Sequence, residues 1–228
     1  MKTIKFLFTL MFVLSAFSLV ISQNVKVNSN FVIESDGTFR MDGAATVWDD
    51  LMVFPDATSR GNSYPPTWRA FKKNSTNNSQ GVYLWFFSSE SEQELYFTAQ
   101  IPHSYKVGTA LYPHVHWTTG SETPTRSNVV WGLEYSVIAI GGTFPYTSTV
   151  RATSIIGGIT SISGVGQHLI SAFSSIPGTD LGISTVICCR LFREVTNSGD
   201  TFGNEVGLLG FDIHYEKDTE GSRSEFIK

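Results

Sequence analysis

The sequence predicts an all-β fold, namely an antiparallel β-sandwich of jelly-roll-like type with about ten strands. Apolar residues recur at every second position or in short bulky runs, which is the period of a β-strand. Turn residues, for example Asp36-Gly37 and Asn197-Ser198-Gly199, interrupt these runs. No window keeps the helical period together with caps, although Gly166 to Ile176 fits either a short helix or a strand.

The expected strands form ten segments along the chain. They cover residues 31–35, 46–54, 68–73, 81–89, 94–102, 110–119, 128–140, 148–156, 184–195 and 205–217. Successive side chains of a strand point to opposite faces, so the alternation also assigns an apolar and a polar face to several strands. The apolar face of 110–119 carries Leu111, Val115 and Trp117. The apolar face of 205–217 carries Leu209, Phe211, Ile213 and Tyr215. We expect these faces to form the core.

One domain is expected for most of the chain, because 228 residues without a linker or an internal repeat suit one hydrophobic core. Residues 1–22 have the features of a signal peptide, or of an N-terminal membrane anchor, since two lysines precede a long apolar run. Residues 23–45 then form an N-terminal extension, and residues 46–228 form the β-sandwich domain. This organisation predicts a secreted or otherwise extracytoplasmic protein that meets the membrane only through its N-terminal segment.

Composition excludes one class of partner and favours another. The net charge is -4 and lysines and arginines do not cluster, so the chain offers no matching surface to the phosphate backbone of a nucleic acid. Charged residues make up only 16% of the chain, which indicates that much of its surface is buried or packed against partners. The segment GVYLWFFSS at 81–89 is apolar on both faces, which favours a subunit contact in a homo-oligomer.

The residues offer little support for nucleophilic catalysis. Cys188 and Cys189 are adjacent in an expected strand, so we expect two free thiols, at least one of them buried and inert. The GxSxG motif of a serine hydrolase is absent. Carboxylates such as Asp49, Asp50 and Glu134 leave a glycosidase pair open, because their separation depends on the fold.

Two histidines two positions apart, His114 and His116, share the polar face of one expected strand in a chain with five histidines. If the last strand pairs with it, His214 joins them, together with Asp212 or Glu216. Two or three imidazoles and a carboxylate are suitable ligands for a divalent metal such as zinc, iron or manganese. The alternative is a polar strand face that hydrogen-bonds to its neighbours or to another subunit. No other cofactor is expected.

A dense group of aromatic residues suits either the core or a platform on which sugars stack. They are Trp68, Tyr83, Trp85, Phe86, Phe87 and Tyr96. Aromatic side chains of a β-sandwich usually belong to its core, whereas a row of exposed rings predicts carbohydrate binding.

Four segments carry a resemblance to a known family. They are TVWDDLMVF at 46–54, AQIPHSYKVGTALYPHVHW at 99–117, CRLFREVTNSGDTF at 189–202 and LLGFDIHYEKDTEGSRSEFIK at 208–228. In combination they resemble a largely uncharacterised family of virion-associated proteins of tailed phages and aquatic viruses, fibre-like or on the capsid surface. The resemblance implies a structural role, and no catalytic residue follows from it.

These observations favour a non-enzymatic structural or adhesive β-sandwich module, exposed on a virion or outside the cytoplasm and assembled as a homotrimer. In a trimer, one histidine of each copy can meet at the axis and bind a metal. Two alternatives stay open. One is a secreted jelly-roll metal-binding protein or metalloenzyme that uses His114, His116 and His214. The other is a carbohydrate-binding module with a surface glycan as its partner.

Overall fold

The computed structural model of the protein describes residues 25–26, 30–75, 79–120, 128–153, 155 and 164–228. The signal peptide predicted for residues 1–22 lies outside the described residues. The described residues form fourteen strands and two short 3₁₀ helices, and none of their helices has the length and apolar character needed to cross a membrane. In chain order the elements are β1 Val25–Lys26, β2 Phe31–Ile33, β3 Phe39–Met41, η1 Gly43–Ala45, β4 Val47–Val53, η2 Pro55–Ala57, β5 Ser59–Arg60, β6 Thr67–Lys72, β7 Val82–Phe87, β8 Gln93–Gln100, β9 Tyr112–Thr119, β10 Trp131–Ile138, β11 Ser148–Ala152, β12 His168–Ala172, β13 Val186–Arg193 and β14 Val206–Lys217.

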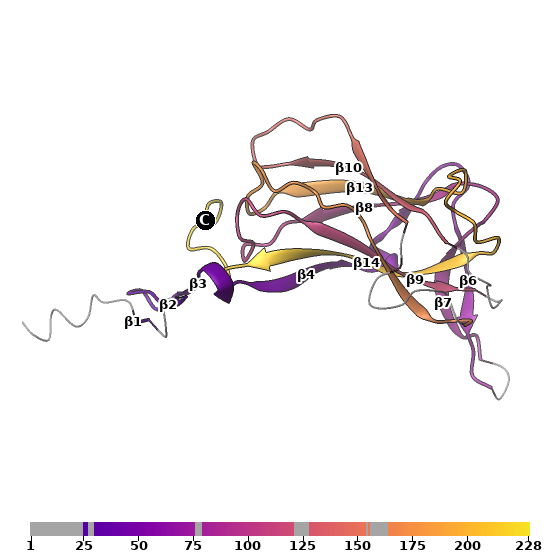
Figure 1. The fold of residues 1–228 in the computed structure, drawn as a ribbon, viewed down its shortest axis with the longest axis horizontal. Helices are drawn as coiled ribbons and strands as arrows, with labels where there is room; N and C mark the ends of the chain where they lie inside the picture. Colours follow the sequence, from indigo (N-terminus) through magenta and orange to yellow (C-terminus); the bar gives the residue numbers. More distant parts are fainter. Residues whose placement is uncertain (1–24, 27–29, 76–78, 121–127, 154, 156–163) are drawn as a thin grey trace, which may run out of the picture.

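Two antiparallel sheets face each other in a sandwich (Figure 1). The five-stranded sheet has the order β11-β10-β13-β8-β5. The six-stranded sheet has the order β12-β9-β14-β7-β6, and β4 pairs with the second half of β14 on the same side as β7. The chain crosses between the sheets from β8 to β9 to β10 and again from β12 to β13 to β14, which gives the sandwich its jelly-roll-like character. The predicted fold class is confirmed.

Each of the ten predicted segments overlaps one strand, and only β6 and β8 begin one residue before their segment. The four additional strands, β1, β3, β5 and β12, are two to five residues long. Strand β12 lies in the segment Gly166 to Ile176, for which the pattern left a helix or a strand open, and it is a strand because it pairs with the edge of β9.

Large aromatic side chains from the two sheets form the centre of the core. Trp117 of β9 and Trp131 of β10 are both 0% exposed, and their ring centroids lie 6.4 Å apart. Phe97 of β8 packs on Phe211 of β14 with ring centroids 4.8 Å apart. Each such burial contributes about 1.5–3 kcal/mol, so these contacts hold the sheets together and fix which faces point outward.

A register shift in the β9–β14 ladder decides which leucine faces the core. The ladder steps from Leu208 to Gly210, so Leu209 is an extra residue in β14. Leu208 is 1% exposed, whereas Leu209 is only partly buried. The prediction that Leu209 lies on the apolar face is therefore wrong, because the bulge changes the alternation before Phe211.

Strand β7 is apolar on both faces, as predicted, but its own chain covers the second face. Phe87 packs in the core against Trp131, with ring centroids 5.1 Å apart, and Phe86 on the opposite face is 0% exposed. The guanidinium of Arg69 lies 3.6 Å from the centre of the Phe86 ring, and Phe71 packs beside it. The burial of Phe86 therefore requires no subunit contact, and the homo-oligomer stays a prediction.

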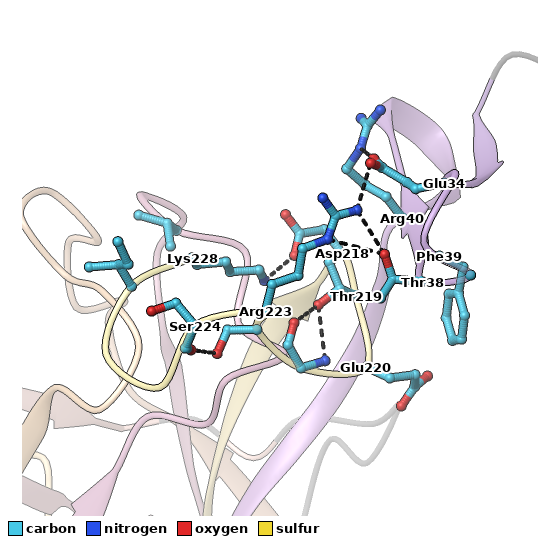
Figure 2. A pocket seen from close by; sticks show the side chains of 15 residues that line it. Glu34, Thr38, Phe39, Arg40, Asp218, Thr219, Glu220, Arg223, Ser224 and Lys228 are labelled. Carbon is cyan, nitrogen blue, oxygen red and sulfur yellow. Dashed lines mark hydrogen bonds and ion pairs between the residues drawn. The ribbon is translucent and has the colours of Figure 1, made fainter. Parts of the chain in front are cut away.

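Strands β1, β2 and β3 form a separate small sheet near the C-terminus of the chain (Figure 1). Residues 218–224, 227 and 228 of the C-terminal segment, together with Glu34, residues 37–40 and Val107, line a cavity of about 770 Å³ (Figure 2). Figure 2 shows Arg223 reaching from the C-terminal segment toward Glu34 and Thr38, to which it donates hydrogen bonds of 2.6 and 2.8 Å. Arg223 therefore ties the N-terminal sheet to the C-terminal segment.

Candidate metal centre

Four of the chain's five histidines gather on the outer face of the six-stranded sheet. His114 and His116 belong to β9, His168 to its neighbour β12, and His214 to β14 on its other side. The side chains of β9 alternate, so the two histidines point away from the core that contains Trp117. The pairing of three strands, rather than the spacing within one, builds the cluster.

The register of β9 and β14 places a carboxylate among these histidines. Asp212 lies directly opposite His114, and Gly210 lies opposite His116. Directly opposite residues have Cβ atoms about 4.5–5.5 Å apart, close enough for their side chains to meet. Gly210 has no side chain, which leaves room for the His116 ring to approach Asp212, and its Nε2 lies 3.2 Å from Oδ2.

His114, Asp212 and His214 form a possible set of metal ligands. One donor atom from each lies within 4.8 Å of the others. Nδ1 of His114 is 3.6 Å from Oδ1 of Asp212, which is too long for a hydrogen bond. Ligand bonds of about 2.1 Å to a tetrahedral zinc ion place two ligand atoms about 3.4 Å apart. The observed separation therefore matches two ligands of one zinc ion.

Both of these atoms are buried and have no hydrogen-bond partner among the described residues. Nδ1 of His114 and Oδ1 of Asp212 are two of the three buried side-chain atoms of this kind in the described part of the chain. The two residues are 8% and 6% exposed, respectively. A cation between them would satisfy both atoms, and the residues present therefore fit a divalent metal.

His116 and His168 support this set through a chain of hydrogen bonds. The carboxylate of Asp212 can only accept, so His116 donates from Nε2 at 3.2 Å. With its proton on Nε2, His116 accepts at Nδ1 from Nε2 of His168, at 2.8 Å. Both ring nitrogens of His116 are therefore hydrogen-bonded, and the role of His116 is to orient Asp212.

The electrostatics of the cluster favour metal binding. Burial and the neighbouring His214 lower the pKa of His114, and burial and His116 lower the pKa of His168. Both rings are therefore neutral at pH 7, which is the form that binds metal. Burial alone would raise the pKa of Asp212, but the hydrogen bond from His116 and the nearby imidazoles hold it below its usual value. Asp212 is therefore an anionic ligand.

The structure does not bring Glu216 into the cluster, although the sequence analysis considered it as a ligand. Its carboxylate lies 2.7 Å from Nζ of Lys106 and accepts a hydrogen bond of 3.2 Å from Thr46. His103, the fifth histidine, lies elsewhere, with its ring nitrogens 2.6 and 3.1 Å from the hydroxyls of Ser222 and Ser184.

The sequence analysis did not assign two members of the cluster to it, Asp50 and His168. Oδ1 of Asp50 on β4 lies 3.1 Å from Nε2 of His214, because β4 pairs with β14 and places the two residues opposite each other. His168 was hidden in the segment whose secondary structure the pattern left open. His168, Ile170 and Ala172 alternate with Leu169, which is the pattern of a strand. This pattern does not show which other strand pairs with the segment.

Exposed apolar side chains flank the cluster. Met52 lies opposite Asp212, and Tyr112 lies opposite His214, in the ladders on either side of β14. Trp48 packs edge-on against Tyr112 with ring centroids 5.3 Å apart, yet remains 58% exposed. The outer face of the sheet thus combines a polar cluster with an apolar rim.

The aromatic residues singled out in the sequence divide into core and surface. Phe86 and Phe87 are fully buried. Trp68, Tyr83 and Trp85 meet on β6 and β7 at an edge of the sandwich. Tyr96 lies on β8 of the other sheet and donates a hydrogen bond to Glu94.

Both cysteines are free, as predicted, with Cys188 exposed and Cys189 buried. Burial strongly raises the pKa of the Cys189 thiol. Cys189 is therefore protonated at neutral pH and unsuited to act as a nucleophile.

No family model and no curated protein matches the chain. Among solved structures, one similar chain is the carbohydrate-binding module TmCBM61 in complex with β-1,4-galactotriose, with 13% identity, a TM-score of 0.30, and coverage of 73% of this chain and 86% of that chain. Another is the enzymatically active domain of tailspike protein 4 of bacteriophage CBA120, with 9% identity and a TM-score of 0.26, covering 75% of this chain and 19% of that chain. Neither similarity carries a function to this chain.

Proposed function

We propose that the protein is a non-enzymatic binding module that acts outside the cytoplasm and holds one divalent transition metal, of the zinc type, on its six-stranded sheet. The observation that carries this proposal is the facing pair of buried atoms without hydrogen-bond partners, Nδ1 of His114 and Oδ1 of Asp212. Leaving such an atom unpaired costs about 1–3 kcal/mol. A metal ion between the two atoms removes that cost for both.

The exposed side of the cluster favours a binding role. Three protein ligands leave one position of a tetrahedral metal free, and the side chain of His214 is 38% exposed. A carboxylate or imidazole of a partner would complete the coordination while the apolar rim of Trp48, Met52 and Tyr112 packs against it.

Catalysis is less well supported than binding. Three other bases belong to the cluster. Both ring nitrogens of His116 form hydrogen bonds, His168 bonds to His116 through Nε2, and Oδ1 of Asp50 lies 3.1 Å from Nε2 of His214. We therefore assign none of them to the activation of a water molecule on the metal.

Metal analysis of the purified protein tests the proposal. We expect about one zinc ion per chain after gel filtration, lost in His114→Ala and in Asp212→Asn. His103→Gln is the matched control and should retain the metal, because His103 hydrogen-bonds elsewhere. Metal that His114→Ala retains, or a ratio of one ion to three chains, would contradict a site within one chain.

A structural homotrimer is the second candidate function. The exposed apolar side chains of Trp48, Met52 and Phe54, each 58–59% exposed, favour contact with another copy. Light scattering on the same gel-filtration peak tests it. A mass of three chains that survives a chelator supports the trimer, and a monomer rules it out.

A further inference from the structure

A second candidate binding site lies at one edge of the sandwich and shares no residue with the histidine cluster. It is a cavity of about 450 Å³ between β5 of the five-stranded sheet and β6 and β7 of the six-stranded sheet. It is lined by Pro55, Asp56, Thr58, Arg60, Trp68 and Trp85. Its size is within the range of small-ligand pockets, which is about 300–1,000 Å³.

One wall of this cavity is aromatic. Trp68 and Trp85 lie directly opposite each other in the β6–β7 ladder, with ring centroids 4.9 Å apart, and Tyr83 lies 6.1 Å from Trp68. Trp85 packs against the core, which holds the group in place, whereas Trp68 is 43% exposed. The indole of Trp68 therefore leaves apolar surface in water, and a ligand that covers it gains about 25 cal/mol per Å².

The cavity is also lined by two charged side chains that form no ion pair with each other or with neighbours among the described residues. Asp56 lies on η2 and Arg60 on β5, and neither forms an ion pair within the described part of the chain. Every other arginine there forms at least one ion pair. The guanidinium of Arg60 lies 5.8 Å from the ring centre of Trp85, and Asp56 lines the same cavity.

We propose that this cavity binds a neutral pyranose unit of a glycan, stacked on Trp68 and hydrogen-bonded through its hydroxyls by Asp56 and Arg60. A pyranose has a face of C–H groups that packs on an indole ring. Its adjacent hydroxyls donate to a carboxylate and accept from a guanidinium. The carboxylate of Asp56 disfavours phosphorylated ligands, and an aliphatic ligand would desolvate both charges without partners. A neutral sugar satisfies both the aromatic rings and the charged side chains.

The test begins with the intact protein on an array of neutral microbial, plant and animal glycans. The best binder is then measured by isothermal titration calorimetry. We expect saturable binding that weakens at least about tenfold in Trp68→Ala and in Asp56→Asn. Trp68→Tyr keeps an aromatic ring and should retain most of the affinity, which separates lost stacking from misfolding. Tyr146→Ala, at an exposed aromatic side chain that belongs to neither site, should leave the affinity unchanged.

A chelator separates this site from the metal centre. Because the two sites share no residue, glycan binding should survive EDTA whether or not the metal proposal holds. The inference is overturned if no neutral glycan on the array binds, if Trp68→Ala leaves the affinity unchanged, or if EDTA abolishes binding.

Discussion

Asp212 lies directly across from His114 in the β9–β14 ladder, and their facing atoms, 3.6 Å apart, are buried without hydrogen-bond partners. An isolated protein would be expected to avoid such an arrangement, because two buried polar atoms lose their contacts with water and gain none. A ligand that binds between these two atoms should therefore raise the free energy of unfolding more than a ligand bound elsewhere.

Zinc should stabilise the folded protein against heat. At a free zinc concentration of 100 times Kd, binding adds about 2.7 kcal/mol to the free energy of unfolding. For a domain of this size that corresponds to a rise in Tm of about 5–10 °C, measurable by differential scanning calorimetry. Glu216→Gln should keep the full shift, because Glu216 contacts Lys106 and Thr46 instead of the cluster. A shift of equal size in His114→Ala would refute the assignment.

Zinc affinity should depend on pH in one direction. Burial and the neighbouring His214 lower the pKa of His114 from its ordinary value of 6.5, so its ring is neutral at pH 7. We expect a constant affinity above about pH 7 and a fall of about tenfold per pH unit well below it, as a proton competes with the metal for the His114 imidazole. Without metal, the same lowered pKa means that the unfolded state protonates first, so stability is also lost as the pH falls below 6.5. Titration calorimetry from pH 5 to 8 checks the first trend, and an affinity constant down to pH 5 would exclude histidine ligands.

His116 should act on the metal through Asp212. Its removal in His116→Ala leaves the carboxylate without its hydrogen bond of 3.2 Å, and we expect a loss of about 10–100-fold in zinc affinity with the stoichiometry unchanged. His168→Ala removes only the next hydrogen bond in the chain and should cost less, about tenfold or below. A competition assay with a fluorescent zinc chelator measures both. Complete loss of the metal in His116→Ala would instead make His116 a direct ligand.

A buried ion pair should matter far more for stability than an exposed one. Arg193 is 0% exposed, donates to both carboxylate oxygens of Asp200 at 2.9 and 2.7 Å, and also binds the carbonyl of Asn204 at 2.7 Å. Arg193→Met leaves the Asp200 charge buried and unpaired, so we expect a loss of about 3–5 kcal/mol in urea unfolding. The control is Arg151→Met, which breaks the more exposed pair with Glu194 and should cost about 1 kcal/mol or less. Equal losses in the two variants would show that burial does not decide the effect.

The two adjacent thiols should differ sharply in reactivity. Cys188 is exposed, whereas burial raises the pKa of Cys189 and shields it from reagents. A disulfide reagent that releases a coloured thiol should therefore react with one thiol per folded chain and with both in denaturant. Cys188→Ser should abolish the reaction of the folded protein. Two reactive thiols in the native state would show that β13 opens readily.

Much of the fold was predictable because it depends on local alternation. The ten segments with strand periodicity each overlap a strand, and the assignment of Val115 and Trp117 to the core is confirmed. The alternation failed at Leu209, where a bulge adds one residue, because a bulge depends on how the partner strand fits. It also could not assign the second apolar face of β7 to Arg69 and Phe71, which come from a neighbouring strand.

The sequence by itself determined the strands, most of their faces, the free cysteines, and that His114 and His116 share a polar face. Only the tertiary structure decided that Asp212 and His214 lie close to His114. It also decided that His168 and Asp50 belong to the cluster, and that Glu216 pairs with Lys106 outside it. The physical reason is that side-chain alternation is a property of each strand. Strand order and register result from the packing of the whole core, so no short stretch of sequence encodes which polar faces become neighbours.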